Sequence, residues 1–276
     1  GSATLFVDPV KVSEGLAAWL EDDVTIAAPA DLAPVLSALG GRRVMIDPAS
    51  ASAWYFEQLQ AAGADILRRP DPTVLPRAIK NPVEIDGARA AHIRDGAALT
   101  RFLHWIATEG QINPPDEKEA VAKLESFREA TGALQDLSFD TIGAANGHGA
   151  LPHYRPTERS NERAKQGSLL LVDSGGQYLD GTTDVTRTMA IGEPTEEMKR
   201  RNTLVLKGHL AIARLRFPAG TTGSQIDAFA RAALWNEGLD YDHGTGHGVG
   251  VYLGVHEGPH RIAKAPNSVA LRPGMI

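Results

Sequence analysis

Two aspartates are the first residues of this sequence whose type and spacing could do chemistry. Asp173 ends the apolar run 169–172, and Asp184 follows eleven residues later, beyond two glycines at positions 175 and 176. Folded as a hairpin, this segment brings the two carboxylates close together. Carboxylates held close in a partly dry place repel each other unless a cation or a proton compensates their charge. The segment therefore indicates a charged site. An alternative stays open, in which Asp173 caps a turn and Asp184 is solvated or paired with Arg187.

A histidine-rich segment is the second feature with chemical potential. His243 and His247 lie in the sequence HGTGHGVG, residues 243–250, and His256 follows. The glycines make a helix here costly by about 1 kcal/mol each, which favours an extended strand with residues 243, 245 and 247 on one face. A lone histidine is usually a hydrogen-bonded core residue. Three histidines so close together, in a chain that also supplies the aspartate pair, favour a functional site.

The elements that must position these residues begin after a separate amino-terminal part. Residues 1–80 alternate short apolar strands with amphipathic helices, which predicts a small α/β domain, and no glycine-rich phosphate loop follows a strand there. Prolines at positions 70, 72 and 76 favour a connector over a helix or a central strand, so we place the domain boundary between residues 80 and 81.

The remaining part, residues 81–276, starts with helices and continues with strands. Apolar residues recur at helical spacing from Pro82 to about Glu109, and a second helix is predicted to start near Asp116. Glycine-punctuated strands follow and carry the aspartates and the histidines. The four tryptophans lie within helical patterns, and we expect them in the core: Trp19, Trp54, Trp105 and Trp235.

Composition narrows the classes of function. The net charge of −6 and the absence of dense basic runs give no electrostatic footprint for nucleic acid or an anionic membrane surface. The sequence has no cysteine, which excludes disulfides and thiolate chemistry and fits a cytoplasmic location. No apolar stretch approaches the length of a membrane span.

The two motifs together resemble those of the M24, or pita-bread, metallopeptidase family, and within it the larger, cytosolic, three-domain type of aminopeptidase P. Residues 173–188, DSGGQYLDGTTDVTRT, are similar to the first metal motif of the family, with the separation of its two aspartates intact. Residues 243–250, continuing to VHEGP at 255–259, are similar to its second motif. The segment LPHY, residues 151–154, resembles the one that supplies a further active-site histidine.

The resemblance implies a fold and a metal site. The fold would be α/β (α+β), with a creatinase-N-like α/β domain at residues 1–80 and a pita-bread domain at residues 81–276. Asp173 would chelate one metal ion, Asp184 would bridge two, and His247 would bind the other. Both ions would be divalent, with Mn²⁺ as the first choice and Zn²⁺ as the second.

The resemblance also implies roles for the other histidines. His153, His243 and His256 would surround and bind the substrate, and His153 and His256 would act as catalytic proton donors. The reaction would be hydrolysis of an amino-terminal Xaa-Pro peptide bond by a hydroxide that bridges the two ions. The partners would be peptides with proline at the second position and a second copy of the chain in a homodimer.

The sequence departs from the family pattern in two ways that bear on metal binding. The sequence contains neither the first domain of the three-domain members nor the two metal-binding glutamates that follow the Pro-Gly-Met-Ile at residues 273–276 in the family. Because two aspartates and one neutral histidine offset only part of the charge of two divalent cations, we expect the chain of residues 1–276 to bind metal weakly or not at all. The alternatives are a prolidase, a methionine aminopeptidase, or a non-catalytic pita-bread module that binds peptides or proteins.

Overall fold

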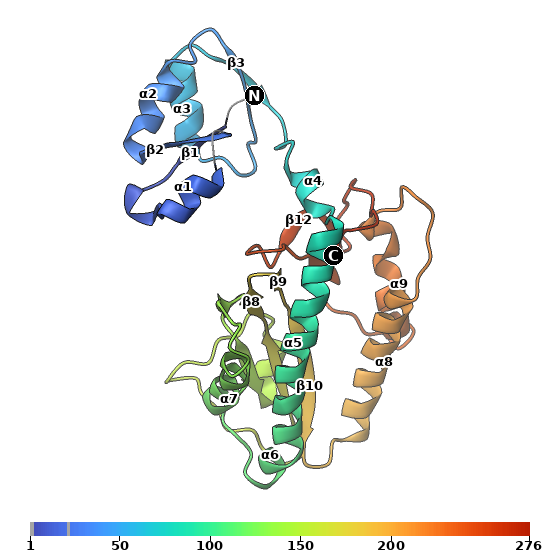
Figure 1. The fold of residues 1–276 in the computed structure, drawn as a ribbon. Coiled ribbons are helices and arrows are strands. Elements are labelled where there is room, and N and C mark those ends of the chain that lie inside the picture. Colours follow the sequence, from blue (N-terminus) through green and yellow to red (C-terminus); the bar gives the residue numbers. More distant parts are fainter. Residues whose placement is uncertain (1–2, 21–22) are drawn as a thin grey trace. The chain divides into compact units, whose positions relative to one another are not determined.

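The computed structural model describes residues 3–20 and 23–276. The chain divides into two compact units, Gly1–Thr73 and Val74–Ile276 (Figure 1). Each unit has its own secondary structure and is described by itself. The predicted site residues all belong to the second unit.

The first unit alternates strands and helices, as its sequence pattern predicts. The four strands of its described part, residues 3–20 and 23–73, form two parallel pairs, β1 with β2 and β3 with β4. Parallel neighbours need a crossover connection, and helices supply it here. Ser13 caps the helix that begins at Glu14, as expected, because its hydroxyl accepts a hydrogen bond from Leu16 N at 3.1 Å. The elements are β1 (Ala3–Phe6), α1 (Glu14–Leu20), β2 (Val24–Ala27), α2 (Leu32–Ser37), β3 (Arg43–Ile46), α3 (Ala53–Ala61) and β4 (Asp65–Arg68).

The second unit opens with helices whose beginnings are set by local capping. Asn81 caps the longest helix and Asp116 caps a later one, and in both cases a glutamate three residues on returns a hydrogen bond to the cap. The proline-rich stretch differs from the prediction, because a short helix begins inside it at Val74. Pro76 lies in the first turn of that helix, where a missing N–H leaves no hydrogen bond broken. The helices are α4 (Val74–Ala78), α5 (Pro82–Ala107), α6 (Glu109–Ile112) and α7 (Glu117–Glu129).

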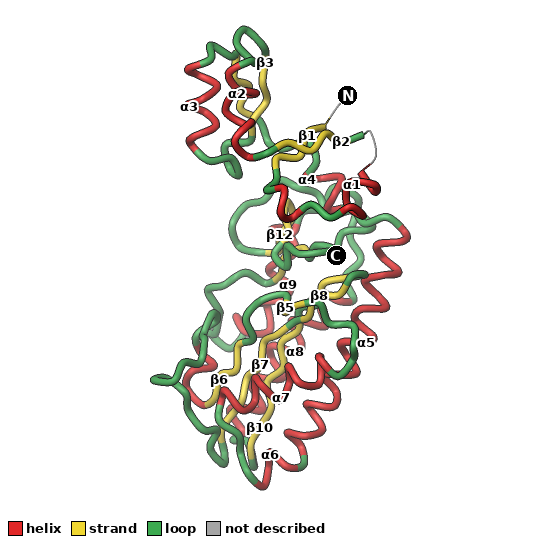
Figure 2. Tube along the Cα trace, turned by 60° about the vertical axis from the view of Figure 1, so that its left-hand side comes forward, coloured by secondary structure: helices red, strands yellow, loops and turns green. Residues whose placement is uncertain are grey.

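The strands of the second unit form three small sheets. The largest has the order β10-β7-β6 with antiparallel neighbours, and in Figure 2 these strands run alongside one another. A second sheet has the order β5-β8-β9, and β11 pairs with β12. The strands are β5 (Asp136–Leu137), β6 (Ile142–Ala145), β7 (Ser168–Ser174), β8 (Gly176–Tyr178), β9 (Gly181–Thr182), β10 (Val185–Ile191), β11 (Gly246–Gly248) and β12 (Glu257–Ile262).

The main core of this unit lies between the helices and the β10-β7-β6 sheet. Phe102 and Ile106 of α5 and Leu124 of α7 are almost completely buried there against Leu170 and Val172 of β7. Burying a large aliphatic or aromatic side chain contributes about 1.5–3 kcal/mol each. This packing fixes strand β7, which carries Asp173.

Helices α8 (Glu196–Ala213) and α9 (Gly223–Trp235) form the connection between the two halves of the candidate site and lie side by side (Figure 1). They approach closely at Gly208, where a Cβ atom would overlap the carbonyl group of Ala230. Only glycine fits such a contact between backbones.

The expectation that all four tryptophans are core residues is wrong for three of them. Trp19, Trp54 and Trp235 are 78%, 39% and 47% exposed, and only Trp105 packs against the main core. Helical spacing shows which face of a helix is apolar, but it does not show how much of that face another element covers.

Among the helices of residues 3–20 and 23–276, none combines the length and the apolar composition that crossing a membrane requires.

Candidate metal centre

The two aspartates lie on or next to a pair of adjacent antiparallel strands. Asp173 lies in β7 opposite Thr186 of β10, and Asp184 immediately precedes β10. The connection is not a simple hairpin, because it contains β8 and β9, which belong to a separate sheet in which β8 pairs with both β5 and β9. The Thr186 hydroxyl donates a hydrogen bond to Asp173 Oδ1 at 2.7 Å, which fixes the orientation of that carboxylate.

His247 reaches the same place from the other half of the unit. It lies in the middle of β11, opposite Arg261 of β12, so the expected extended conformation is present. Its Nδ1 is 2.8 Å from the carbonyl oxygen of Gly248. A carbonyl only accepts, so Nδ1 carries the proton and Nε2 is left to bind a cation or an acid. Nε2 is 3.2 Å from Asp184 Oδ2.

His256 completes a compact cluster with these two residues. It precedes β12, and its ring meets that of His247 edge to face with the centroids 4.2 Å apart. One ligand atom from each of Asp184, His247 and His256 lies within 4.8 Å of the others, and within residues 3–20 and 23–276 this is the one group of three or more such side chains with that property. Asp173 does not belong to this group.

Electrostatic interactions couple the three predicted metal ligands, Asp173, Asp184 and His247. Burial raises the pKa of the Asp173 carboxyl, and the negative charge of Asp184 raises it further, while the Thr186 hydrogen bond opposes the rise. The hydrogen bond with Asp184 raises the pKa of the His247 imidazole, although burial lowers it. Without a cation, therefore, the site favours binding of protons, which is the compensation expected where acidic groups crowd together.

The donor set fits a divalent transition metal. Carboxylate oxygens and an imidazole nitrogen are ligands of Mn²⁺ and Zn²⁺. The partly buried Asp184 carboxylate and the His247 tautomer present two of these donors toward each other, with His247 Nε2 3.2 Å from Asp184 Oδ2. Asp184, His247 and His256 have ligand atoms within 4.8 Å of one another, so these three side chains could hold such an ion together.

The structure places the other two predicted histidines outside the cluster. His243 is exposed just before β11, its ring stacked on that of Tyr241 with a centroid distance of 4.7 Å. His153 is exposed in the turn that follows a short 3-10 helix at Asn146–Ala150. Neither side chain belongs to the group of potential ligands around Asp184, as far as the described residues show.

Sequence reasoning missed two buried charged residues that support the histidine segments. Glu117, fully buried in α7, accepts hydrogen bonds from Tyr154 Oη at 2.7 Å and from the backbone N–H of Ala145 at 2.8 Å and of Glu162 at 3.1 Å. It also contacts His148 Nδ1 at 2.7 Å. The chain from 145 to 162, which carries His153, is thus tied to α7 at both ends.

The second missed residue is Arg231 in α9, which is fully buried and binds the segment before β11. Both residues look like part of a solvated helical face in the sequence. The available signal for Arg231 was Asp227 four residues before it, a helical pairing that forms a salt bridge at 2.7 Å.

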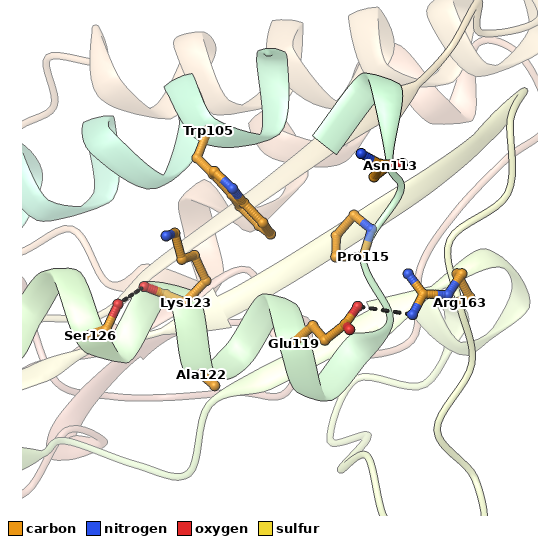
Figure 3. A pocket seen from close by; sticks show the side chains of 8 residues that line it. All are labelled: Trp105, Asn113, Pro115, Glu119, Ala122, Lys123, Ser126 and Arg163. Carbon is orange, nitrogen blue, oxygen red and sulfur yellow. Dashed lines mark hydrogen bonds and ion pairs between the residues drawn. The ribbon is translucent and has the colours of Figure 1, made fainter. Parts of the chain in front are cut away.

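A surface groove elsewhere in this unit shares no residue with the predicted site. It runs along α7 and is lined by Trp105, Glu119, Lys123 and Arg163 among others, with Glu119 and Arg163 paired at 3.1 Å (Figure 3).

Comparison with known proteins gives a consistent result for both parts of the chain. Residues 86–276 match the family described as Metallopeptidase family M24, and residues 1–84 match the Creatinase/Prolidase N-terminal domain. A probable Xaa-Pro aminopeptidase P of Laccaria bicolor is 52% identical over 230 residues, which are 79% of this chain and 36% of that protein.

Two solved structures are similar over nearly the whole chain. The X-prolyl aminopeptidase of Caenorhabditis elegans, described as a cytosolic enzyme with a di-nuclear active site, has a TM-score of 0.88 and 36% identity and covers 99% of this chain and 46% of its own. The prolidase of Pyrococcus furiosus has a TM-score of 0.80 and 26% identity, covering 99% of this chain and 77% of its own. The chain spans less than half of the length of the curated relatives it matches.

Proposed function

Because this chain belongs to metallopeptidase family M24, we propose that the whole protein is a metal-dependent aminopeptidase that hydrolyses the bond between an amino-terminal residue and a following proline. The observation that carries the proposal is the convergence of Asp184, His247 and His256, whose ligand atoms lie within 4.8 Å of one another. The names of the Laccaria and Caenorhabditis relatives support the Xaa-Pro substrate class.

The comparisons confirm the family and the fold that the two motifs predicted. The resemblance to M24 metallopeptidases is confirmed by the match of residues 86–276 and by the similarity to the X-prolyl aminopeptidase structure. The fold is a creatinase-type N-terminal domain followed by the pita-bread fold.

In this proposal Asp173, Asp184 and His247 hold the metal ions, of which there are two, with Mn²⁺ as the first choice and Zn²⁺ as the second. The di-nuclear site of the Caenorhabditis enzyme supports the number. When bound, the ions supply Lewis acidity, which stabilises negative charge on a carbonyl oxygen and lowers the pKa of water. Burial and the neighbouring carboxylate raise the pKa of Asp173, so a cation would displace a proton that this site otherwise favours.

The remaining side chains bind the substrate and move protons. His256 lies edge-on to His247, close enough to reach a peptide carbonyl or the leaving nitrogen at the metal centre and to donate a proton there. His153 would share that role from its exposed turn. His243 would bind the peptide, because its Nδ1 faces the Gly244 carbonyl at 2.8 Å and its Nε2 remains for a hydrogen bond to the substrate.

A prolidase is the second candidate, because the prolidase of Pyrococcus furiosus shares this fold with a TM-score of 0.80. The whole protein, loaded with Mn²⁺, should therefore be assayed on three substrates: Xaa-Pro tripeptides, Xaa-Pro dipeptides and methionine-initiated peptides without proline. We expect the highest kcat/KM on the tripeptides. Preference for dipeptides would assign a prolidase, and preference for the methionine peptides a methionine aminopeptidase.

Location and assembly are part of the same proposal. We place the protein in the cytoplasm, supported by the absence of cysteine and by the description of the Caenorhabditis relative as cytosolic. We propose a homodimer on the family resemblance, and sedimentation of the whole protein at micromolar concentration tests it. A monomer mass would contradict the homodimer.

A further inference from the structure

A buried arginine outside the predicted site is bonded to the segment that presents the histidines. Arg231, in α9, is completely buried, and its Nε donates to Asp227 Oδ2 at 2.7 Å. Its two terminal nitrogens also donate to groups outside the helix. One nitrogen, Nη1, donates to Asp240 Oδ1 at 2.9 Å and to the carbonyl oxygen of Tyr241, and Nη2 donates to the carbonyl oxygen of His243 at 2.9 Å.

The Tyr241 ring continues this contact from the arginine to the histidine. The guanidinium of Arg231 lies over one face of the ring, 3.8 Å from its centroid, and the ring is also stacked with His243. The phenol oxygen is 2.6 Å from the hydroxyl of Thr245. Thr245 in turn donates to Asp227, the same carboxylate that pairs with Arg231. These contacts therefore form a closed ring that links Arg231 and Asp227 of α9 to residues 240–245.

Few other side chains could hold this arrangement. A guanidinium has five donors in a fixed planar fork, so it can bind a carboxylate on α9, a second carboxylate and two loop carbonyls at once while stacking on an aromatic ring. A lysine ammonium could keep the pairing with Asp227 but not the remaining contacts. The glycines at positions 244 and 246 leave the loop little rigidity of its own, since glycine restricts the backbone least.

We propose that Arg231 and the ring of Tyr241 are positioning residues that hold His243 in place to bind the peptide substrate. This inference rests on the proposed function, because it assigns a role to His243 in that site. Arg231 and Tyr241 act through His243, not on the substrate.

The test measures KM and kcat separately in the whole protein, together with equilibrium binding of a non-hydrolysable Xaa-Pro peptide analogue by calorimetry. Arg231→Lys should raise KM and the dissociation constant of the analogue about 10- to 100-fold with a smaller change in kcat, because misplacing a binding group by about 1 Å has effects of this size. Tyr241→Leu, which loses the stack, should act in the same direction. Tyr241→Phe keeps the ring and should stay within about threefold of the wild type.

Arg128→Lys is the matched control, since Arg128 is also fully buried and pairs with Asp95 at 2.7 Å, but this pair joins α7 to α5 and not to the histidine segment. It should lower stability without changing KM in the folded protein. The inference is wrong if Arg231→Lys and Tyr241→Leu keep wild-type KM and analogue affinity, or if Arg128→Lys raises KM equally. A wild-type protein that hydrolyses no Xaa-Pro peptide would instead contradict the proposed function.

Discussion

His247 Nε2 lies 3.2 Å from Asp184 Oδ2, although the whole α8–α9 helical pair separates these residues in the chain. The sheet packed on α5 and α7 positions the aspartate, and the β11–β12 pair positions the histidine. This contact joins the two motifs into one site.

Thr186 orients Asp173 and should therefore affect metal affinity. Replacing it in Thr186→Val removes the hydroxyl that donates to Asp173 Oδ1 at 2.7 Å. Loss of a hydrogen bond to a metal ligand typically weakens binding about 10- to 100-fold. We expect a decrease of this size in the Mn²⁺ affinity of the whole protein, measured by calorimetry. Thr186→Ser keeps the donor and should bind nearly as the wild type does; equal affinities for wild type and Thr186→Val would show that Asp173 does not need this bond.

Glu117 should be essential for the stability of the second unit. In Glu117→Gln the carboxylate becomes an amide, whose nitrogen faces N–H and O–H donors and leaves at least one of them unsatisfied in the interior. A buried unsatisfied polar group costs about 1–3 kcal/mol, and we expect the free energy of unfolding in urea to fall by this amount.

The control for this experiment is Glu129→Gln, on the same helix but exposed. It changes the net charge equally and should leave the urea midpoint unchanged. If the two variants unfold alike, Glu117 is not the structural centre that its contacts indicate.

The ion pair between α5 and the β8–β9 turn should make stability depend on pH. Arg94 donates to both oxygens of Asp180, at 2.9 and 3.0 Å, and this bond holds the pKa of the Asp180 carboxyl below its usual value of 3.8. A depressed pKa contributes stability that is fully present above 3.8 and is lost as the pH falls through the lower folded value. Because the pair is partly exposed, we expect Asp180→Asn to lower the free energy of unfolding at pH 7 by only about 0.5–1 kcal/mol.

The difference in the free energy of unfolding between wild type and Asp180→Asn should shrink as the pH falls below 3.8. Urea denaturation at several pH values measures this difference. Asp86→Asn, which breaks an exposed pair with Arg89 on the same helix, should have no measurable effect. If the wild type remained more stable than Asp180→Asn by the same amount at the lowest pH, the pH dependence would not come from this ion pair.

Local signals in the sequence predicted most of the elements because their causes are local. Asp116 caps its helix through a glutamate three residues away, and strand–helix alternation follows from apolar spacing alone. The departure of β8 and β9 into another sheet was not predicted, because Gly175 and Gly176 permit several turns and the choice depends on β5, far back in the chain.

The site itself was predictable only in part for the same reason. Two motifs of recognisable spacing contain Asp173, Asp184 and His247, but the sequence does not show that His256 meets His247 at 4.2 Å between ring centroids. Glu117 and Arg231 were missed because an isolated charge in a helical pattern looks solvated until its tertiary partners are known.

The central claim is that Asp173, Asp184 and His247 bind divalent metal ions in the whole protein. Calorimetric titration of the metal-depleted whole protein with Mn²⁺ tests it most directly, with Asp184→Asn measured beside the wild type. We expect two ions bound per wild-type chain and loss of at least one of them in the variant. No binding to the wild type, or the same stoichiometry and affinity in Asp184→Asn, would contradict it.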